Sequence, residues 1–405
     1  MTLKNIILAA GRAKRELSVL IPPEKNKVLL RILGKPVIYY PLHSLQEASG
    51  KETIIVYRKG EEQVINEARN YSKHPIIPIA QEEGNTIREA ILAASKELDK
   101  ENYFFLVFGD IVIEPEPLIR LYNTHLTEEP DATILLVPYD PEYAETYGTA
   151  TIDEEGYLTK TLTSKSIEKP KYIIGGAYIL PNHILDLLEK NMSLPEAINQ
   201  LIREGAKIKT ILWTGTWIDI GYPTDLLEAD YTLLSMIKST MISDKAEIEP
   251  TSTIIGPVLI DENTYIDHHV LIKGPVYIGK NSFIGAYSFI RQYSDINNNV
   301  RIGAYNEVKK SNIQPYTLLD SYVYIADSII GENSIIGAYT ITLNVLEAKM
   351  KTPRVRKHLV NPPKKEIEKL GAIIGYNTKI GTKTIIYPGK TIKPETIIEP
   401  DTVLR

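Results

Sequence analysis

Residues 278–308 read IGKNSFIGAYSFIRQYSDINNNVRIGAYNEV, and this stretch decides the fold of the second half of the chain. An aliphatic side chain returns at every sixth position, at Ile278, Ile284, Ile290, Ile296, Ile302 and Val308. Side-chain direction repeats after about 3.6 residues in an α-helix and after about two in a β-strand, so neither element alone produces this spacing. A solenoid with three flat faces, and one six-residue repeat on each face, directs all of these side chains to its inner axis. The stretch therefore predicts a three-sided β-solenoid.

The six-residue spacing extends beyond this stretch in both directions. It begins at Ile248, and after an interruption it returns at Tyr324, Ile330 and Ile336 and again from Ile374 to Leu404. Glycine follows the aliphatic residue where we expect tight turns, at Gly279, Gly285, Gly303, Gly331, Gly337, Gly375 and Gly381. With these features, residues 239–405 resemble the left-handed parallel β-helix of hexapeptide-repeat proteins.

Two interruptions break the spacing. Between Val308 and Leu318 the register slips by four residues, which predicts a bulge or a loop. The second interruption, at about residues 345–370, is a basic insertion that we expect to project from one face as a loop. Two interpretations of its charge stay open, a clamp for the phosphates of coenzyme A or of a nucleotide, and a solvated charged loop.

Residues 1–238 follow another pattern, in which short β-branched runs alternate with helical periodicity. The runs KNIILAAG, ETIIVYR, NYFFLVFGD and ATILLVPY are typical of strands. The segments PVIYYPLHSLQEA, EEQVINEARNYS and TIREAILAASKEL place apolar residues three to four apart, as helices do. This alternation predicts a Rossmann-like α/β domain with a mostly parallel sheet. Ligands of such sheets bind at the carboxyl ends of the strands, where Gly11, Gly109 and Asp110 fall.

The bulk properties limit the class of protein. With 405 residues the chain is long for a single core, which predicts two domains, 1–238 and 239–405. A net charge of −5 gives no reason to expect nucleic acid as a partner. The absence of cysteine excludes disulfides, thiol catalysis and cysteine-bound metals. We find neither a signal-peptide pattern nor an apolar run that could span a membrane, so we expect a cytoplasmic protein.

Residues 8–27, LAAGRAKRELSVLIPPEKNK, place a basic loop directly after the first predicted strand. Together with GKP at residues 34–36, this stretch resembles the sugar-1-phosphate nucleotidylyltransferases, which join a sugar 1-phosphate to an NTP and release pyrophosphate. Gly11, Arg15 and Lys27 match the loop of that family. The resemblance implies that Gly11 binds the nucleotide, and that Arg15 and Lys27 are catalytic because they stabilise charge on the α-phosphate and the leaving pyrophosphate.

Two residues of this region depart from the family pattern. Ala13 stands at the position of a second glycine, and Asn26 replaces the proline that precedes the lysine. Alanine keeps the backbone N–H donor but adds a methyl group. If position 13 needs a left-handed backbone, alanine costs on the order of 1 kcal/mol, which slows an enzyme without abolishing its activity.

Two aspartates match positions at which the family holds a cation. Asp110 follows a strand in VFGDIV, and Asp219 lies in TWIDIG ahead of a predicted helix. Nucleotidyl transfer requires the triphosphate charge to be neutralised, and Mg²⁺ is usually held by one or two protein carboxylates. The resemblance therefore implies Asp110 and Asp219 as Mg²⁺ ligands. The alternative for either residue alone is an aspartate that caps the end of a strand.

The predicted sugar-phosphate site is assembled from three short motifs. IEKP supplies Glu168 and Lys169, and Gly148 and Gly176 keep the family's spacing on either side of them. Ile174 stands where the family has an asparagine that contacts the sugar. Loss of that amide removes a hydrogen bond and should alter sugar selection. The alternative for the Glu-Lys dipeptide is a solvated ion pair.

The predicted base-contacting segment is AQEEGNTIREAI, residues 80–91. It keeps Gln81, Gly84 and Thr86 as nucleotide-binding candidates, but Asn85 splits the family's Gly-Thr pair. The alternative is an exposed glutamine in a loop before a helix that Asn85 or Thr86 caps.

Residues 321–344, SYVYIADSIIGENSIIGAYTITLN, resemble the bifunctional enzymes that also acetylate an amino-sugar phosphate. The matching positions are Tyr324, Asp327, Ser328 and Asn344. Ser321 stands where these enzymes have their catalytic histidine, and serine is not a base near neutral pH. This argues against acetyl transfer and against acetyl-CoA as a cofactor. His358, in the insertion, is the remaining candidate base of an acyltransferase site, and its alternative is an exposed loop histidine.

Three interpretations of the function follow. The first is a nucleotidylyltransferase that forms an NDP-sugar with Mg²⁺, and the resemblance implies a homo-oligomer, a trimer or a dimer of trimers. The second is a regulatory or scaffolding paralogue that binds nucleotide or NDP-sugar, which the departures at Ala13, Ile174 and Ser321 favour. The third is an acyltransferase whose first domain is only structural. The retained charged residues favour the first, while the sequence leaves the nucleotide and the sugar open.

Overall fold

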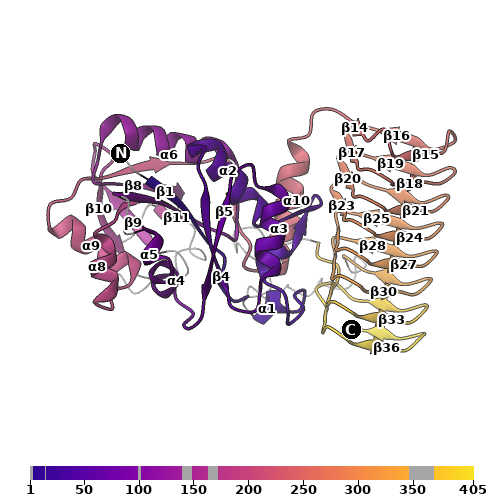
Figure 1. Cartoon of the computed structure of the whole chain (residues 1–405). Helices are drawn as coiled ribbons and strands as arrows, with labels where there is room; N and C mark the ends of the chain where they lie inside the picture. Colours follow the sequence, from indigo (N-terminus) through magenta and orange to yellow (C-terminus); the bar gives the residue numbers. More distant parts are fainter. Residues whose placement is uncertain (1–2, 14, 99–101, 139–147, 163–171, 346–368) are drawn as a thin grey trace. The chain divides into compact units, whose positions relative to one another are not determined.

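The computed structural model describes residues 3–13, 15–98, 102–138, 148–162, 172–345 and 369–405. The chain forms two compact units, whose elements are labelled in Figure 1. The first unit comprises Met1–Arg12, Glu24–Leu29 and Val37–Asp219, and the second comprises Ala13–Pro23, Leu30–Pro36 and Ile220–Arg405. The division into domains after residue 238 stays a prediction. Within the described ranges, no helix has the length and apolarity needed to cross a membrane.

The first unit is built around one nine-stranded sheet with the order β10-β9-β11-β6-β1-β4-β5, in which β8 pairs with β11 and β12 pairs with β8. The four predicted strands are present as β1 (Leu3–Leu8), β4 (Thr53–Arg58), β6 (Tyr103–Phe108) and β8 (Ala132–Pro138). With β5 (Ile76–Gln81), the group β5-β4-β1-β6 is parallel throughout. The centres of β1, β4 and β6 are buried, as expected of parallel strands covered on both faces. The Rossmann-like α/β fold is confirmed.

Beyond β6 the sheet becomes mixed. Strand β11 (Tyr172–Pro181) runs antiparallel to β6, to β8 and to β9 (Thr149–Ile152). Strand β10 (Leu158–Leu162) is antiparallel to β9, and β12 (Ile208–Leu212) is parallel to β8. A separate pair, β7 (Ile111–Ile113) with β13 (Trp217–Asp219), is also antiparallel. The parallel part therefore supplies the strand ends that form the pocket described below.

Helices appear where the sequence predicts them. The predicted segments form α2 (Tyr39–Ser49), α3 (Gln63–Tyr71), and α4 (Ile87–Ala93) with α5 (Ser95–Leu98). Among its described residues, the first unit also contains α6 (Pro115–Glu128), α8 (Ile184–Glu189), α9 (Leu194–Arg203) and the 3-10 turn η1 (Lys27–Leu29).

The coils of the second unit form three parallel eight-stranded sheets (Figure 1). The first sheet contains β14 (Met241–Ile242), β17 (Val258–Ile260), β20 (Val276–Ile278), β23 (Ser294–Ile296), β26 (Asn312–Ile313), β29 (Ile329–Ile330), β32 (Ile373–Ile374) and β35 (Thr391–Ile392). The second contains β15 (Glu247–Ile248), β18 (Tyr265–Ile266), β21 (Phe283–Ile284), β24 (Arg301–Ile302), β27 (Leu318–Leu319), β30 (Ile335–Ile336), β33 (Lys379–Ile380) and β36 (Ile397–Ile398). The third contains β16 (Thr253–Ile255), β19 (Leu271–Lys273), β22 (Phe289–Ile290), β25 (Glu307–Lys309), β28 (Tyr324–Ala326), β31 (Ile341–Thr342), β34 (Ile385–Ile386) and β37 (Val403–Leu404). The predicted left-handed β-helix of hexapeptide repeats is confirmed.

The interior of the β-helix holds the predicted aliphatic residues, with two corrections. Val308 pairs with Ile325, and Ile325 is fully buried, whereas Tyr324 is only partly buried and pairs with an outward position. The prediction that Tyr324 belongs to the inner column is therefore wrong. The slip after Val308 is also smaller than predicted, because Ile313 is already inside and pairs with Ile296. Two shortened corners absorb the slip, one between Val308 and Ile313 and one between Ile325 and Ile330, so that the strands on both sides of them stay in register.

The repeated glycines are required by close approach of successive coils and not by the turns themselves. None of the seven predicted turn glycines has a positive φ. A Cβ atom on Gly285 would lie 2.6 Å from the carbonyl carbon of Gly303, and one on Gly279 would lie 2.8 Å from that of Asn297. Glycine is the one residue that leaves the space these neighbouring backbones occupy.

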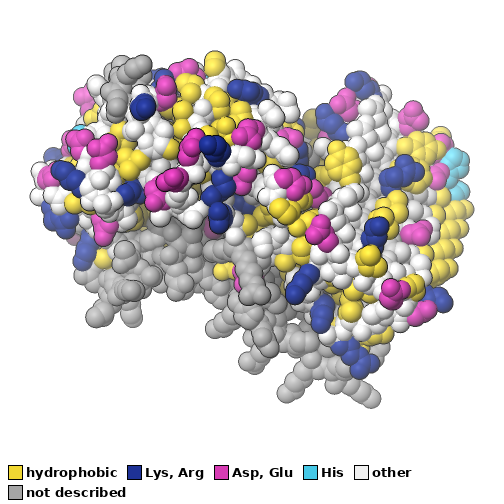
Figure 2. Space-filling model, turned by 60° about the horizontal axis from the view of Figure 1, so that its bottom comes forward, with side chains coloured by type: hydrophobic (Ala, Val, Ile, Leu, Met, Phe, Trp, Pro, Cys, Tyr) yellow, Lys and Arg dark blue, Asp and Glu magenta, His cyan; other side chains and the backbone are white. Residues whose placement is uncertain are grey.

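The turns are made by other residues in the left-handed conformation. At one corner these residues are His269, Tyr287, Tyr305, Tyr322 and Tyr339, with φ between 58° and 62°. Aromatic residues rarely adopt such φ values. Here successive rings stack at centroid distances of 4.8 to 5.0 Å, which offsets part of the strain. Figure 2 shows hydrophobic side chains in a stepped column along one edge of the coils.

Three segments from outside the coils complete the second unit. The first contains α1 (Arg15–Ser18), and its Val19 carbonyl accepts a hydrogen bond from the Tyr376 N–H at 3.1 Å. The second is the hairpin of β2 (Arg31–Ile32) and β3 (Lys35–Pro36), and the third is α10 (Pro223–Ser235). Gly34, in the hairpin, has a φ of 72°, and a Cβ atom there would lie 1.9 Å from the Tyr277 hydroxyl. The glycine of the GKP motif is thus required by packing.

The hairpin and α10 cover polar residues on the outer side of the first sheet. The Leu33 N–H donates to Asp295 Oδ2 at 2.8 Å. Asn312 Nδ2 donates to Asp230 Oδ2 at 2.9 Å and to Asp295 Oδ2 at 3.0 Å. Asp230 and Asp295 are buried, and the two carboxyl groups also contact each other. Two carboxylates cannot hydrogen-bond to each other without a proton, so this contact requires one of the two groups to be protonated.

Candidate functional site

A pocket opens at the carboxyl edge of the parallel strands in the first unit, where the topology of open α/β sheets predicts a ligand site. It is lined by Leu8, Ala9, Ala10, Gly11, Lys27, Val28, Gln81, Asn85, Thr86, Ile87, Ala90, Phe108 and Asp110. The pocket thereby brings together Gly11, Lys27, Gln81, Thr86 and Asp110, which the sequence places in the nucleotide and metal sites.

The charged centre of the pocket is a pair formed by Lys27 and Asp110. The Lys27 Nζ atom lies 2.5 Å from Asp110 Oδ2, and the two side chains are 12% and 20% exposed. Attraction between the charges is stronger than on the surface because little water screens them. Gly11 borders this pair, since a Cβ atom there would lie 3.9 Å from Lys27 Cε. The pocket thus presents one ammonium group and one carboxylate to a ligand.

Asp219 reaches the same edge through strand pairing. In the pair of β13 with β7, Asp219 lies opposite Ile111, the residue that follows Asp110. Its side chain is buried. The strand is held by Trp217, whose indole N–H donates to the Gly175 carbonyl at 2.8 Å. Asp110 and Asp219 are therefore neighbours in space although they are far apart in the sequence.

Asp110, which lines the pocket, and Asp219, which lies opposite the next residue, are the carboxylates that could hold a magnesium ion here. Mg²⁺ prefers oxygen ligands and usually takes one or two protein carboxylates, completing its octahedron with phosphates and water. Within the described ranges, no three His, Cys, Asp or Glu side chains gather into a closed metal cage. The carboxylates that would hold the cation are those of Asp110 and Asp219, and the cation would neutralise charge on the triphosphate.

The segment after β5 contributes to the pocket, but its polar residues are engaged locally. Gln81 Nε2 donates to the Glu83 carbonyl at 3.1 Å. Thr86 caps α4 in a reciprocal arrangement with Glu89, whose carboxylate accepts from the Thr86 N–H at 2.9 Å. Helix capping, the alternative considered for Thr86, is therefore realised. Gly84 has a φ of 85°, and a Cβ atom there would lie 2.1 Å from Glu89 Oε2, so this turn requires glycine.

Two residues of the N-terminal loop lie differently from the expectation. Ala13 has no positive φ, so the backbone strain considered for this position does not arise. Arg15 begins α1 in the second unit, and its side chain lies outside the described part of the structure.

The predicted sugar-phosphate site is described only in part. Gly148 and Gly176 have φ of 76° and 71°, values that favour glycine. Ile174 is buried in β11, and its N–H donates to the Gly148 carbonyl at 3.3 Å. Glu168 and Lys169 lie outside the described residues.

Sequence reasoning missed three polar residues behind the pocket. Asn26 and Arg58 each donate a hydrogen bond to the loop that follows β1. Glu61 accepts a hydrogen bond from Asn26 and forms an ion pair with Arg58. The signal available in the sequence was the departure at Asn26 itself, because an amide in place of proline adds a donor and an acceptor. Arg58 and Glu61 carried no signal, since Arg58 is the last residue of a strand and Glu61 lies in the polar segment before α3.

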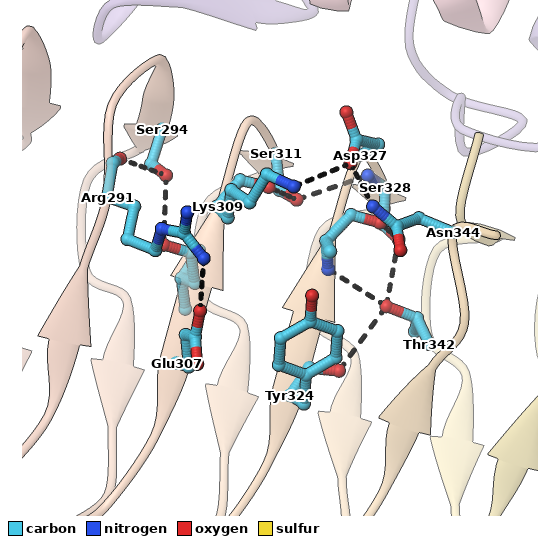
Figure 3. Close-up of polar contacts among 12 residues, drawn as sticks. Arg291, Ser294, Glu307, Lys309, Ser311, Tyr324, Asp327, Ser328, Thr342 and Asn344 are labelled. Carbon is cyan, nitrogen blue, oxygen red and sulfur yellow. Dashed lines mark hydrogen bonds and ion pairs between the residues drawn. The ribbon is translucent and has the colours of Figure 1, made fainter. Parts of the chain in front are cut away.

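A second polar cluster lies on the third sheet of the β-helix (Figure 3). Asn344 Nδ2 donates to Asp327 Oδ2 at 2.5 Å, and Lys309 Nζ lies 3.7 Å from the same oxygen. The Thr342 hydroxyl donates to the Tyr324 carbonyl at 3.3 Å. The structure therefore brings the predicted Tyr324 and Asn344 together, while His358 lies outside the described residues.

The described side chains of this cluster include no histidine, and its ionisable groups are protonated or engaged in ion pairs. Burial, followed by the charge of Glu307, raises the pKa of the Tyr324 phenol above its ordinary value, so the phenol stays protonated. Arg291 Nη1 lies 2.6 Å from Glu307 Oε1, and Lys309 is paired with Asp327. Ser321, at the position of the expected histidine, has its N–H bound to Asp320 Oδ1 at 2.8 Å.

Comparison with known proteins agrees with both halves of the chain. Residues 4–236 match the family model described as "Nucleotidyl transferase". The chain is 36% identical over 409 residues to the "Bifunctional protein GlmU" of Methanococcus maripaludis (strain C7), covering 97% of this chain and 92% of that protein. It is 30% identical over 393 residues to the protein of the same name from Methanocaldococcus jannaschii, covering 95% and 90%. A "Bifunctional sugar-1-phosphate nucleotidylyltransferase/acetyltransferase" of Sulfurisphaera tokodaii is 28% identical over 99% of this chain and 97% of its own length.

Proposed function

Because the chain belongs to the nucleotidyl transferase family, we propose that it joins a nucleoside triphosphate to a sugar 1-phosphate, forming an NDP-sugar and releasing pyrophosphate. The observation that carries this proposal is the pair of Lys27 and Asp110 beside Gly11, with Asp219 opposite the residue after Asp110. The similarity to bifunctional relatives over nearly the whole chain supports the same assignment.

In the proposed reaction, an oxygen of the sugar 1-phosphate attacks the α-phosphorus of the triphosphate. The bond from that phosphorus to the oxygen bridging the β-phosphate breaks, and pyrophosphate leaves with the electron pair. Lys27 stabilises the negative charge that develops on the phosphates, and the backbone at Gly11 allows them to approach closely. Arg15 is proposed to assist the leaving pyrophosphate.

The remaining substrate contacts are assigned by position. Gln81, Gly84 and Thr86 belong to the segment that would border the base. The sugar phosphate would be held by Gly148, Glu168, Lys169 and Gly176. Asp110 and Asp219 would hold Mg²⁺, which neutralises charge on the triphosphate when it is bound.

Pyrophosphate release tests the proposal directly. With Mg²⁺ present, each nucleoside triphosphate is paired with a panel of sugar 1-phosphates, and at least one pair is expected to give turnover. Asp219→Asn is expected to lower kcat/KM for that pair about 100-fold, because a carboxylate that faces the cation is lost. The exposed residue Asp186 on α8 offers a control, and Asp186→Asn is expected to retain full activity.

No release across the whole panel would contradict the proposal. If a nucleoside triphosphate still raised the melting temperature in that case, the chain would bind nucleotide without turnover. The regulatory alternative considered from the sequence would then be the correct one.

Acetyl transfer by the β-helix is not part of the proposal, and a gain-of-function variant tests this choice. The wild-type chain is expected to transfer no acetyl group from acetyl-CoA to an amino-sugar 1-phosphate, because Ser321 supplies no base. Ser321→His is expected to produce transfer at least tenfold above that background, since Tyr324 and Asn344 already lie in one cluster. Transfer by the wild type, lost in His358→Ala, would show that the insertion supplies the base.

We also propose that the protein is a homotrimer, or a dimer of trimers, and that it acts in the cytoplasm. The assembly is the one that the resemblance to bifunctional enzymes implies, and the similarity to such relatives extends over nearly the whole chain. The location is supported by the proposed substrates, because nucleoside triphosphates are available there.

A further inference from the structure

We propose that Asn26 and Asn85 are positioning residues, joined by Glu61 and Arg58 into one network that fixes the phosphate-binding loop of the pocket. The loop is the segment of residues 9–12 that follows β1. This inference rests on the proposed function of the pocket, because it treats the loop as the place where the triphosphate lies. All residues of the network belong to the first unit.

Asn26 connects the loop to the turn that carries Lys27. Its Nδ2 donates to the Gly11 carbonyl at 3.2 Å and to Glu61 Oε2 at 2.7 Å. Its Oδ1 accepts from the Val28 N–H at 3.1 Å. The side chain is buried, so each of these bonds is made away from water. Proline, the residue expected at this position from the resemblance, has no polar side-chain atom and can make none of them.

Arg58 carries the network from Glu61 to the other side of the pocket. Its Nε lies 3.9 Å from Glu61 Oε1, and both side chains are largely buried. Its Nη2 donates to the Ala10 carbonyl at 3.0 Å and to Asn85 Oδ1 at 2.9 Å. Asn85 lines the pocket next to Thr86. One guanidinium group therefore ties the loop to the segment after β5.

The network fixes the direction of two successive peptide groups in the loop. The Ala10 carbonyl is held by Arg58 and the Gly11 carbonyl by Asn26. In a planar trans peptide the N–H points opposite to the C=O. The N–H groups of Gly11 and Arg12 are therefore turned away from the network. Backbone N–H groups held in a fixed direction are suitable donors for a phosphate.

The two departures from the family pattern are thus connected. Asn26 replaces a proline of the family pattern, and Asn85 splits its Gly-Thr pair. Taken alone, each departure suggests that the nucleotide-binding motif is weakened. Together they form the two ends of one polar chain, in which Asn26 is hydrogen-bonded to Glu61, Glu61 forms an ion pair with Arg58, and Arg58 is hydrogen-bonded to Asn85. We infer that the network replaces the rigidity that proline supplies elsewhere, and that its substitution weakens triphosphate binding more than sugar-phosphate binding.

A double-mutant cycle on the full-length protein tests this inference. The affinity of each nucleoside triphosphate with Mg²⁺ is measured by calorimetry for the wild type, Asn26→Ala, Asn85→Ala and the double variant. Each single variant is expected to weaken the affinity about tenfold, and the double variant by much less than 100-fold, because both remove the same network. Where turnover is found, KM for the triphosphate is expected to rise while KM for the sugar 1-phosphate stays within twofold.

Asn5→Ala is the matched control, because it also removes a buried asparagine that makes three side-chain hydrogen bonds, to Ser49, Lys51 and Thr53. It is expected to lower the melting temperature without changing nucleotide affinity. The inference is overturned if Asn26→Ala, like Asn5→Ala, leaves the nucleotide affinity unchanged. It is also overturned if the affinity loss of the double variant equals the product of the losses of the two single variants. Binding without turnover in the wild type would refute the proposed reaction and leave the network to be judged by affinity, whereas the absence of nucleotide binding would refute both.

Discussion

Lys27→Ala is expected to lower kcat/KM for pyrophosphate release about 1,000-fold. The Lys27 ammonium group is largely buried, lies 2.5 Å from Asp110, and borders Gly11 in the pocket. In such a site a fixed positive charge stabilises a developing phosphate charge more strongly than it does in water. Its removal also leaves the Asp110 carboxylate without its partner, which repels the incoming triphosphate. The measurement is pyrophosphate release at saturating Mg²⁺ with the substrate pair found in the panel.

Two further variants separate the role of this charge from folding. Lys73→Ala removes an exposed lysine paired with Glu47 and is expected to leave the rate unchanged. Lys27→Arg keeps the positive charge but replaces the compact ammonium group with a planar guanidinium group, so its rate is expected to lie between those of Lys27→Ala and the wild type. A Lys27→Ala enzyme that keeps its melting temperature and stays within tenfold of the wild-type rate would show that Lys27 is not catalytic.

The second large effect concerns the stability of the second unit and its dependence on pH. Burial, together with the proximity of the other carboxyl group, raises the pKa of Asp230 well above its ordinary value, and burial raises that of Asp295 to about 6. The groups that contact the pair are Asn312, the Leu33 N–H and Asn297, and no basic side chain in the described part of the chain forms an ion pair with it. The folded protein therefore binds protons more tightly than the unfolded chain.

The sign of the effect follows from proton linkage. A carboxyl group whose pKa is raised by folding contributes its full stability below the unfolded value, near 3.9, and loses it as the pH rises through the folded value. One extra bound proton changes the free energy of unfolding by about 1.4 kcal/mol per pH unit. With its pKa of about 6, Asp295 alone is expected to lose roughly 1 kcal/mol from pH 5 to pH 7, and the raised pKa of Asp230 adds to this loss. Denaturant unfolding at each pH measures this loss.

Asp230→Asn is the variant that tests the assignment. Asparagine is neutral at every pH and can still accept from Asn312 while it donates to Asp295, so the loss of stability between pH 5 and pH 7 is expected to be much smaller. Asp244→Asn changes an exposed aspartate of the same unit and is expected to retain the wild-type dependence. If Asp230→Asn and the wild type lose stability in parallel, the buried pair does not hold the proton.

Local features of the sequence predicted most of the fold. The strands around Ile6, Ile54 and Phe105 and the helices between them follow from apolar runs and periodicity over a few residues. The exceptions arose where two coils or two segments meet. The Tyr324 side chain is outside the interior of the β-helix because the corner between Ile325 and Ile330 is one residue shorter, and the sequence alone does not show which residue is omitted.

The candidate site divides in the same way. Gly11, Lys27 and Asp110 were predicted because each lies at the end of a strand within a recognisable motif, and the structure places all three in one pocket. The capping role of Thr86 was one of two open alternatives, and the geometry of α4 decided it. The contacts of Arg58 and Glu61 could not be predicted, because neither residue belongs to a motif.

The sequence by itself therefore determined the β-helix, the parallel strands and the residues at the strand ends, because these depend on spacing between near neighbours. Only the tertiary structure decided that Asp219 lies beside Asp110, that Asn26 and Asn85 share one network, and that Asp230 meets Asp295. The physical reason is that a contact between distant residues is set by packing and strand register across the whole unit. A single buried carboxyl or amide group does not change the hydrophobic periodicity of the segment that contains it, so the pattern of that segment does not reveal it.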